Sequence, residues 1–160
     1  MPDRGGRISR LSRHSSDDAV GRIEYLAFRL AADLYAVSIE RIGEILRIPP
    51  VAPVPRAPAH VMGIVGVRGR VLTVLDVRER LGLQRQPATR HARVLVLPVG
   101  NGESVGMYVD EVLQVFRVAE TQIEPAARGL GGDVGEHAVG IVRLHRDLVL
   151  VIRLEPLLEA

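Results

Sequence analysis

The amino-acid sequence predicts a mainly β protein made of two small five-stranded barrels, related by an internal duplication and packed with a groove between them. Valine occupies 23 of the 160 positions, and β-branched side chains favour strands over helices. Two sets of segments also recur along the chain in the same order. Closing a five-stranded sheet into a barrel buries its apolar face and removes exposed edges, so two small barrels account for both observations.

The first predicted elements form a hairpin followed by a helix. Residues 25–30 and 34–37 are apolar runs typical of strands, and the short link at 31–33 between them indicates a hairpin. Four apolar residues then fall at helical spacing and predict a short amphipathic helix: Ile39, Ile42, Ile45 and Leu46. That helix must end before Pro49, because proline cannot continue it.

The next segment is rich in proline and precedes a second hairpin. Residues 49–58 carry five prolines and are expected to form an extended loop, suitable at most for an edge strand. Residues 62–67 and 71–75 are predicted strands, and Gly69 allows a tight turn between them. Asp76 is then placed to cap a helix that ends at Gly82.

The duplication rests on matched blocks in the two halves of the chain. Residues 35–42 align without gaps on 105–112, and 45–48 align on 115–118. Further on, 63–65 match 140–142, and 71–75 match 148–152. We therefore expect a first barrel unit at about 23–90 and a second at about 91–158, an arrangement that allows strands to be exchanged between them.

Composition excludes several classes of protein. The chain is 47% hydrophobic and 25% charged, which is typical of globular proteins. It has no cysteine, which excludes disulfide scaffolds, thiolate metal sites and cysteine nucleophiles. No apolar run approaches the roughly 20 residues that span a bilayer, and the N-terminus lacks the apolar segment of a secretory signal. We therefore expect a cytoplasmic protein.

The basic charge of the chain belongs to its N-terminal end. Residues 1–22 hold five Arg and three Asp, whereas residues 23–160 hold 16 Arg and 16 acidic residues. The first 22 residues are expected to be a disordered tail, attached to a body of zero net charge. A nucleic-acid-binding barrel that uses this Arg-rich tail is the alternative function. The neutral body and the five aromatic residues, most of them on predicted strands, argue against it.

The chemistry-bearing residues form no pattern of an enzyme. The five histidines are scattered, and none has a partner at metal-ligand spacing. The nucleophile elbow, the phosphate-binding loop and the dinucleotide fingerprint are all absent from the sequence. Three carboxylates are expected to cap or face helix ends: Glu40, Asp76 and Asp110. We predict no catalytic residue, no metal and no cofactor.

Several ordered motifs resemble the CheW-like adaptor domains of bacterial chemotaxis. The most specific is the block G-I/V-x-x-x-R-G-x-x-x-x-x-x-D, which begins at Gly63 and ends at Asp76. The V-D-E-V block from Val109 to Val112 is the next most specific. The similarity extends from Ile23 to about Leu158. One departure is Thr73, which stands where the family commonly has proline.

The resemblance implies a fold and a function. It implies two SH3-like, five-stranded β-barrels and a non-catalytic coupler that links chemoreceptor cytoplasmic tips to a CheA-type histidine kinase. The kinase's regulatory domain shares this fold, which allows pseudo-symmetric pairing and ring assembly. Receptor tips are expected in the groove between the barrels. An adaptor that binds only one of the two partners is the alternative within the family.

The resemblance also assigns residues to the two partners. Arg68, in the Arg-Gly turn, matches the family residue associated with receptor coupling. Glu44 and Ile42 match positions implicated in receptor or kinase contact, and we assign them with Arg68 to the receptor. For the kinase, apolar residues expected to be exposed near the first barrel are the candidates: Val37, Met62 and Ile64. Gly63 and Gly69 are expected to serve backbone geometry rather than contact.

Overall fold

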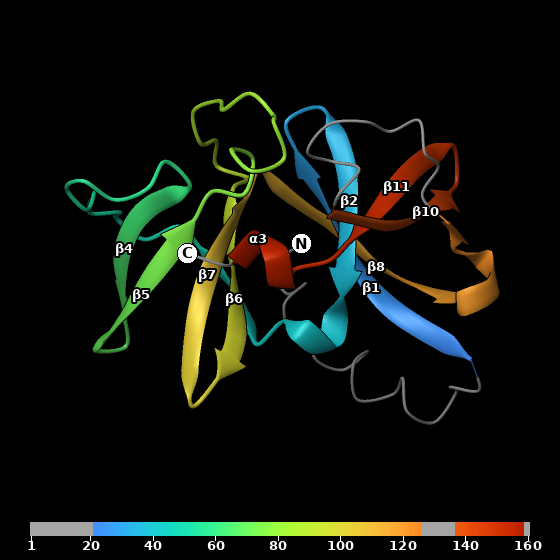
Figure 1. Ribbon diagram of the computed structural model, residues 1–160, viewed down its shortest axis with the longest axis horizontal. Helices are drawn as coiled ribbons and strands as arrows, with labels where there is room; N and C mark the ends of the chain where they lie inside the picture. The colour runs from blue at the N-terminus through green and yellow to red at the C-terminus, as the bar shows by residue number, and fades with distance from the viewer. Residues whose placement is uncertain (1–20, 126–136, 159–160) are drawn as a thin grey trace.

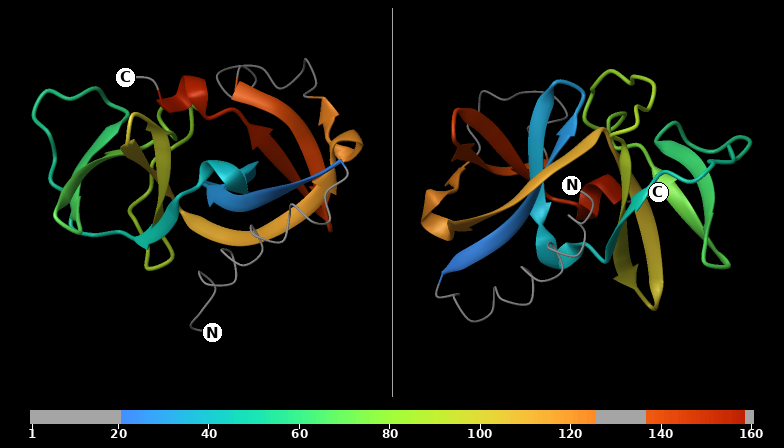
Figure 2. Two further views of the ribbon diagram at one scale, coloured as in Figure 1. Left: turned by 90° about the horizontal axis from the view of Figure 1, so that it is seen from below. Right: turned by 180° about the vertical axis from the view of Figure 1, so that it is seen from behind.

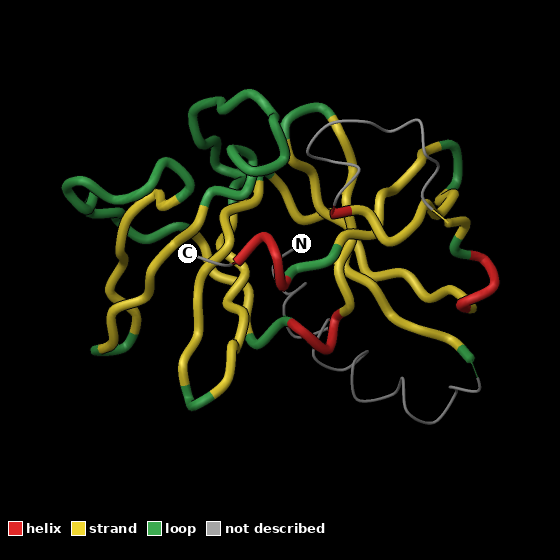
Figure 3. Tube along the Cα trace, viewed as in Figure 1, coloured by secondary structure: helices red, strands yellow, loops and turns green. Residues whose placement is uncertain are grey.

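The chain folds into two curled β-sheets that pack side by side, as Figures 1 and 2 show. A computed structural model describes residues 21–125 and 137–158. Strands dominate, as the colouring by secondary structure in Figure 3 shows, so the prediction of a mainly β protein is confirmed. Most of the predicted tail lies outside the described residues, but Arg22 already begins the first strand.

The larger sheet has six strands in the order β8-β1-β2-β11-β10-β9. We call it the six-stranded barrel. Its neighbours pair antiparallel except β11 and β2, which run parallel. Its strands are β1 (Arg22–Leu30), β2 (Asp33–Ser38), β8 (Glu111–Ala119), β9 (Glu124–Pro125), β10 (Ala138–Leu144) and β11 (Asp147–Ile152).

The smaller sheet has five strands in the order β3-β6-β7-β5-β4. We call it the five-stranded barrel. Here too one neighbouring pair, β5 with β7, runs parallel and the others antiparallel. Its strands are β3 (Glu44–Arg47), β4 (Val61–Val67), β5 (Arg70–Leu75), β6 (Arg93–Gly100) and β7 (Glu103–Val109). Three short helices complete the described fold: the 3-10 turns η1 (Ile39–Arg41) and η2 (Glu120–Gln122), and α3 (Glu155–Leu158).

The two sheets repeat one arrangement. If β9 is set aside, the order β8-β1-β2-β11-β10 corresponds strand for strand to β3-β6-β7-β5-β4. In each sheet the central hairpin is flanked on one side by the strand that follows the other sheet's hairpin, because β3 follows β2 and β8 follows β7. Each barrel therefore combines strands from both sides of residue 90. Whether residues 23–90 and 91–158 act as separate units stays a prediction.

The space between the barrels is filled by apolar side chains. Strand β1 is buried on both faces, with Leu26 and Phe28 in the cluster between the sheets and Tyr25 and Ala27 inside the six-stranded barrel. A third cluster fills the five-stranded barrel. The contact between the barrels is thus packed core, where the sequence led us to expect a groove. Its buried members are Leu26, Phe28, Leu30, Tyr35, Val37, Ile39, Val77, Leu81, Leu95, Leu97, Met107, Val109, Ile152, Leu154 and Leu157.

The prediction of a helix from Ile39 to Leu46 is wrong. One 3-10 turn covers Ile39–Arg41, and the chain then extends as β3 along β6. The backbone N–H of Gly43 donates to the carbonyl of Val96 at 2.8 Å, which begins this pairing. A two-turn helix is too short to be stable alone, whereas pairing with β6 gives the backbone groups of this segment hydrogen-bond partners. The helical spacing of the isoleucines is therefore overridden by the sheet.

The helix predicted after Asp76 is also absent, and successive turns take its place. The N–H of Leu81 donates to the carbonyl of Val77 at 3.0 Å, and that of Leu83 to the carbonyl of Arg78 at 2.9 Å. Gly82 has φ +70, so the predicted stop is correct although the helix is not formed. The Asp76 carboxylate accepts from the backbone N–H of Arg78 at 3.1 Å, which resembles the expected cap.

The same structural constraint requires glycine at the matched positions 63 and 140 of the duplication. Gly63 and Gly140 lie at the register shifts of β4 and β10. A Cβ on Gly63 would lie 2.4 Å from the carbonyl oxygen of Ala52, and one on Gly140 would lie 2.6 Å from that of Glu124. In both barrels a crossing segment therefore lies directly against the strand, which only glycine permits.

Candidate interaction surface

Arg68 and Glu44 lie together at the free end of the five-stranded barrel. Arg68 and Gly69 occupy the two-residue turn between β4 and β5 with φ +49 and +78, as a type I′ turn requires. The guanidinium donates through both terminal nitrogens to the Glu44 carboxylate on β3, with Nη1 to Oε2 at 3.0 Å. This pairing raises the pKa of Arg68. The structure thus brings together two of the three residues that the sequence assigned to receptor contact.

An open hollow of about 780 Å³ lies beside this ion pair. Its walls are the hairpins β4–β5 and β6–β7, and its inner lining includes Leu72 and Val96. It opens here because β5 pairs with β7 only at Val74 and Leu75. Val71, with 71% of its surface exposed, and Val99 form an apolar part of the rim. Figure 1 shows both hairpins projecting together at this end of the molecule.

Ile42 lies in a different environment from the Arg68–Glu44 pair. It caps the 3-10 turn η1, and its N–H donates to the carbonyl of Ile39 at 3.1 Å. Its side chain is half-buried and packs against the core between the barrels. Glu155 of α3 pairs with Arg41 of the same turn, so η1 is tied to the C-terminal helix. Ile42 therefore contributes to the core and leaves only part of its side chain for contact.

The three residues assigned to kinase contact lie in different environments. Val37 is only 1% exposed and belongs to the core between the barrels, so the expectation that it is a surface residue is wrong. Its position in the strand alternation directs it inward, toward the other sheet. Met62 and Ile64 on β4 are half-buried. Met62 packs against the core of the five-stranded barrel, and Ile64 pairs with Ala52 of the proline-rich segment through an isolated bridge.

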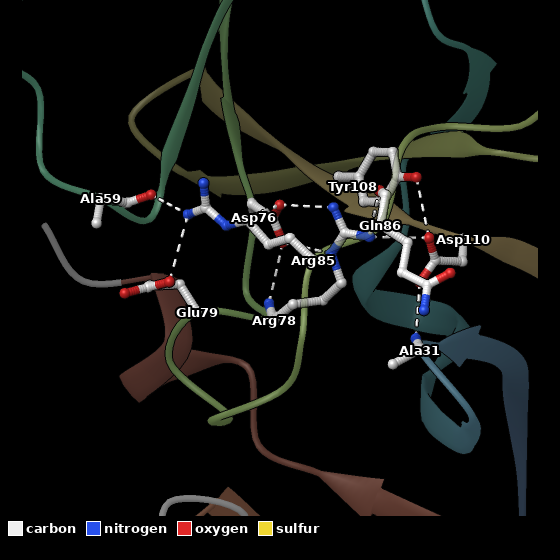
Figure 4. Close-up of polar contacts among 9 residues, drawn as sticks. All are labelled: Ala31, Ala59, Asp76, Arg78, Glu79, Arg85, Gln86, Tyr108 and Asp110. Atoms are coloured by element: carbon white, nitrogen blue, oxygen red, sulfur yellow. Dashed lines mark hydrogen bonds and ion pairs between the residues drawn. The ribbon is translucent and has the colours of Figure 1, made fainter.

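A buried polar cluster of Asp76, Arg78, Tyr108 and Asp110 lies where the two barrels meet (Figure 4). Arg78 is 2% exposed, and its Nε and Nη2 donate to the two oxygens of Asp76 at 2.9 and 2.8 Å. Its Nη1 donates to Oδ1 of Asp110 at 3.0 Å, and the Tyr108 hydroxyl donates to the same oxygen at 3.0 Å. The guanidinium also lies 4.3 Å from the centre of the Tyr108 ring.

Electrostatics keep Arg78 positively charged. Burial alone would lower the pKa of Arg78, but the hydrogen bonds and charge of Asp76, followed by the charge of Asp110, outweigh it and raise that pKa. Burial, and then the hydrogen bond to Asp110, raise the pKa of Tyr108 to about 12. This cluster was not predicted from the sequence, where Asp76 and Asp110 were expected only to cap or face helix ends. The available signal was the Asp-x-Arg spacing directly after a strand.

The described residues offer no candidate metal site. No group of three or more His, Asp or Glu side chains among them is placed to hold a metal ion. Within residues 21–125 and 137–158, no helix has the length and apolar character that a membrane crossing requires. All five aromatic side chains are buried: Tyr25, Phe28, Tyr35, Tyr108 and Phe116. None is therefore available as a stacking platform for nucleic-acid bases.

The fold and this surface define a two-barrel interaction module whose accessible features are an ion-paired turn and an apolar rim. Comparison with known proteins is consistent with this class. The family model described as the CheW-like domain matches residues 24–160. The chemotaxis protein CheW of Rhizobium meliloti is 29% identical over 84% of this chain and 86% of its own length. The protein FrzA of Myxococcus xanthus is 34% identical over 75% of this chain and 74% of its own.

A solved structure matches as well. The crystal structure of the scaffolding protein TtCheW from Thermoanaerobacter tengcongensis superposes with a TM-score of 0.76 at 25% identity, covering 86% of this chain and 88% of that one. The chain therefore belongs to the CheW-like domain family, and the predictions of family and of two SH3-like β subdomains are confirmed. Membership places it among chemotaxis scaffold proteins rather than enzymes.

Proposed function

We propose that this chain is a non-enzymatic adaptor that couples a chemoreceptor cytoplasmic tip to a CheA-type histidine kinase. It would act in the cytoplasm, as a component of receptor arrays. The observation that carries this proposal is the exposed Arg68–Glu44 pair beside a hollow with an apolar rim, in a chain of the CheW-like family. The pair and the hollow are proposed as the receptor-binding surface.

The position of Arg68 favours binding over a purely structural role. Its side chain is 73% exposed, and ion pairs in such positions add little to stability. Its backbone has φ +49, a conformation that glycine or asparagine would adopt at lower cost. An arginine in this turn is therefore not explained by folding. Its value lies in a guanidinium that projects from a rigid hairpin and can donate to an incoming carboxylate.

The hollow supplies the apolar half of the surface. Val71 and Val99 expose their side chains on its rim, next to the charged pair. An apolar rim beside a charged pair suits a partner surface with an apolar stripe flanked by acidic residues. Ile42, just before β3, does not line the hollow, so we propose that it contributes to receptor contact only through the exposed part of its side chain.

For the kinase we propose a contact through β4, at its partly exposed residues Met62 and Ile64. Both lie on an outer strand of the five-stranded barrel, and among the described residues only the short bridge to Ala52 covers its free edge. A regulatory domain of the same fold could pair with such a strand pseudo-symmetrically, and copies of this chain could do so in rings. An adaptor that binds the receptor alone is the alternative, and separate titrations distinguish the two.

Replacing Arg68 with Ala is expected to weaken receptor binding at least about tenfold, as expected for the loss of a central arginine at an interface. The thermal midpoint should stay nearly unchanged, because the lost ion pair is exposed. Isothermal titration with a soluble receptor-tip fragment measures the first quantity and calorimetry the second. The matched control is Arg146→Ala, which alters the corresponding turn of the six-stranded barrel. A large drop in the midpoint with unchanged affinity would show that Arg68 is structural.

A further inference from the structure

We propose that the buried polar cluster sets the angle between the two barrels, with Arg78 as the positioning residue. The proposal concerns the geometry of the chain itself and goes beyond the coupling function. This angle matters for the proposed coupling function, because an adaptor that binds two partners must hold its two barrels at a fixed angle.

The members of the cluster come from separate parts of the five-stranded barrel and its connections. Asp76 directly follows β5, and Arg78 lies in the long connection between β5 and β6. Tyr108 is on β7, and Asp110 is the single residue between β7 and β8. The chain leaves the five-stranded barrel for the six-stranded one at Asp110. Arg78, bonded to both aspartates, therefore ties the crossing point to the end of β5.

Asp110 also attaches directly to the six-stranded barrel. Its Oδ2 accepts a hydrogen bond from the backbone N–H of Ala31, in the β1–β2 turn, at 2.7 Å. Its own N–H donates to the carbonyl of Arg29 at 3.0 Å. The same carboxylate thus holds Ala31 of one barrel on one oxygen and Arg78 and Tyr108 of the other barrel on the second, as Figure 4 shows.

These bonds matter because the apolar core does not specify an angle by itself. Hydrophobic burial is non-directional, whereas a fully satisfied buried polar network selects one geometry. At this end of the contact the surface between the barrels is hollowed. A hollow of about 190 Å³ lies between the β1–β2 turn and the long connection, lined by Ala31, Ala32, Gln86 and Pro87 among others. The polar bonds are therefore the direct link between the barrels here. Arg78 also donates to the carbonyl of Gln86 at 3.2 Å, which holds the connection in place.

The same cluster accounts for an acidic residue in each of two sequence motifs, which the receptor surface leaves unexplained. Asp76 closes the block that begins at Gly63, and Asp110 is the acidic residue of the Val109–Val112 block that precedes Glu111. The two blocks lie more than 30 positions apart in the chain and meet through Arg78. Asp76 and Asp110 therefore act together to fix the angle between the barrels.

The test measures the distance between the barrels with no partner present. The chain has no cysteine, so spin labels can be placed at R70C and D147C, which are exposed and equivalent positions at the starts of β5 and β11. We expect Asp110→Asn to broaden and shift the distance distribution measured by pulsed electron resonance. The amide cannot accept on both sides, so one of the two attachments is lost. Glu111→Gln is the matched control, because it makes the same chemical change at the next residue and should leave the distribution unchanged.

Tyr108→Phe provides a milder variant in case Asp110→Asn folds poorly. It removes one donor to Asp110 and keeps the ring on Arg78, so a smaller broadening is expected. Distributions for Asp110→Asn and Tyr108→Phe that overlay the parent would overturn the proposal. Because no receptor or kinase enters the experiment, its failure would leave the coupling function untouched.

Discussion

Replacement of Arg78 with Met is expected to lower the free energy of unfolding by about 3–5 kcal/mol, the usual cost of removing one partner from a buried ion pair. Methionine retains much of the buried volume, but it leaves the carboxylates of Asp76 and Asp110 without their cation. This is a large share of the about 5–15 kcal/mol that stabilises a typical domain. Urea unfolding followed by circular dichroism measures the loss.

Arg85→Met is the matched control for this prediction. Arg85 also approaches Asp76, with Nε 3.5 Å from Oδ2, but its side chain is 43% exposed. Its removal is expected to cost less than about 1 kcal/mol, as for other exposed pairs. Equal costs for the two variants would contradict the assignment of Arg78 as the residue that neutralises the cluster.

Gly63→Ala is expected to cost about 2–4 kcal/mol through a steric clash and an unfavourable backbone conformation. The added Cβ would lie 2.4 Å from the carbonyl oxygen of Ala52 and 2.6 Å from Cγ1 of Val51. The backbone oxygen cannot rotate away, and φ is +154. Thermal or urea unfolding of the purified variant gives the cost.

Gly66→Ala, three residues further along the same strand, is the matched control. A Cβ there meets no atom within 4 Å, so we expect a change within about 1 kcal/mol. Gly140→Ala should repeat the cost of Gly63→Ala in the other barrel, since its Cβ would meet Ile123 and the Glu124 carbonyl. A neutral Gly63→Ala would mean that the segment at Ala52 can move away from β4.

The strands were predictable because two local signals agree on them: residue types that favour strands, and turn residues at the strand ends. The segments of β1, β2, β4 and β5 combine β-branched or aromatic residues with turn residues at their ends. The duplication was also predictable, because the close backbone contacts at Gly63 and Gly140 require glycine at both matched positions. The failures lie where pairing overrides local spacing. β3 becomes a strand because it meets β6, a partner some 50 positions later in the chain.

The candidate site was predictable only in part. Arg68 and Glu44 followed from the family resemblance, and the structure adds that they bond to each other. Val37 was misjudged because β2 is buried on both faces, one in its own barrel and one against the other. Alternation of apolar and polar residues reveals which face of a strand is buried, but a strand that is apolar on both faces has no such alternation. The polar cluster could not be predicted, because Asp76 and Asp110 are 34 positions apart and meet only in the folded chain.

The most direct test of the proposed coupling is a titration of this chain with a soluble receptor-tip fragment and with the regulatory domain of a CheA-type kinase, first separately and then together. We predict binding to each and a ternary complex when both are present, detected by analytical ultracentrifugation or light scattering. The Arg68→Ala variant should lose the receptor and retain the kinase. Absence of binding to both partners, or binding to only one of them, would contradict the coupling role.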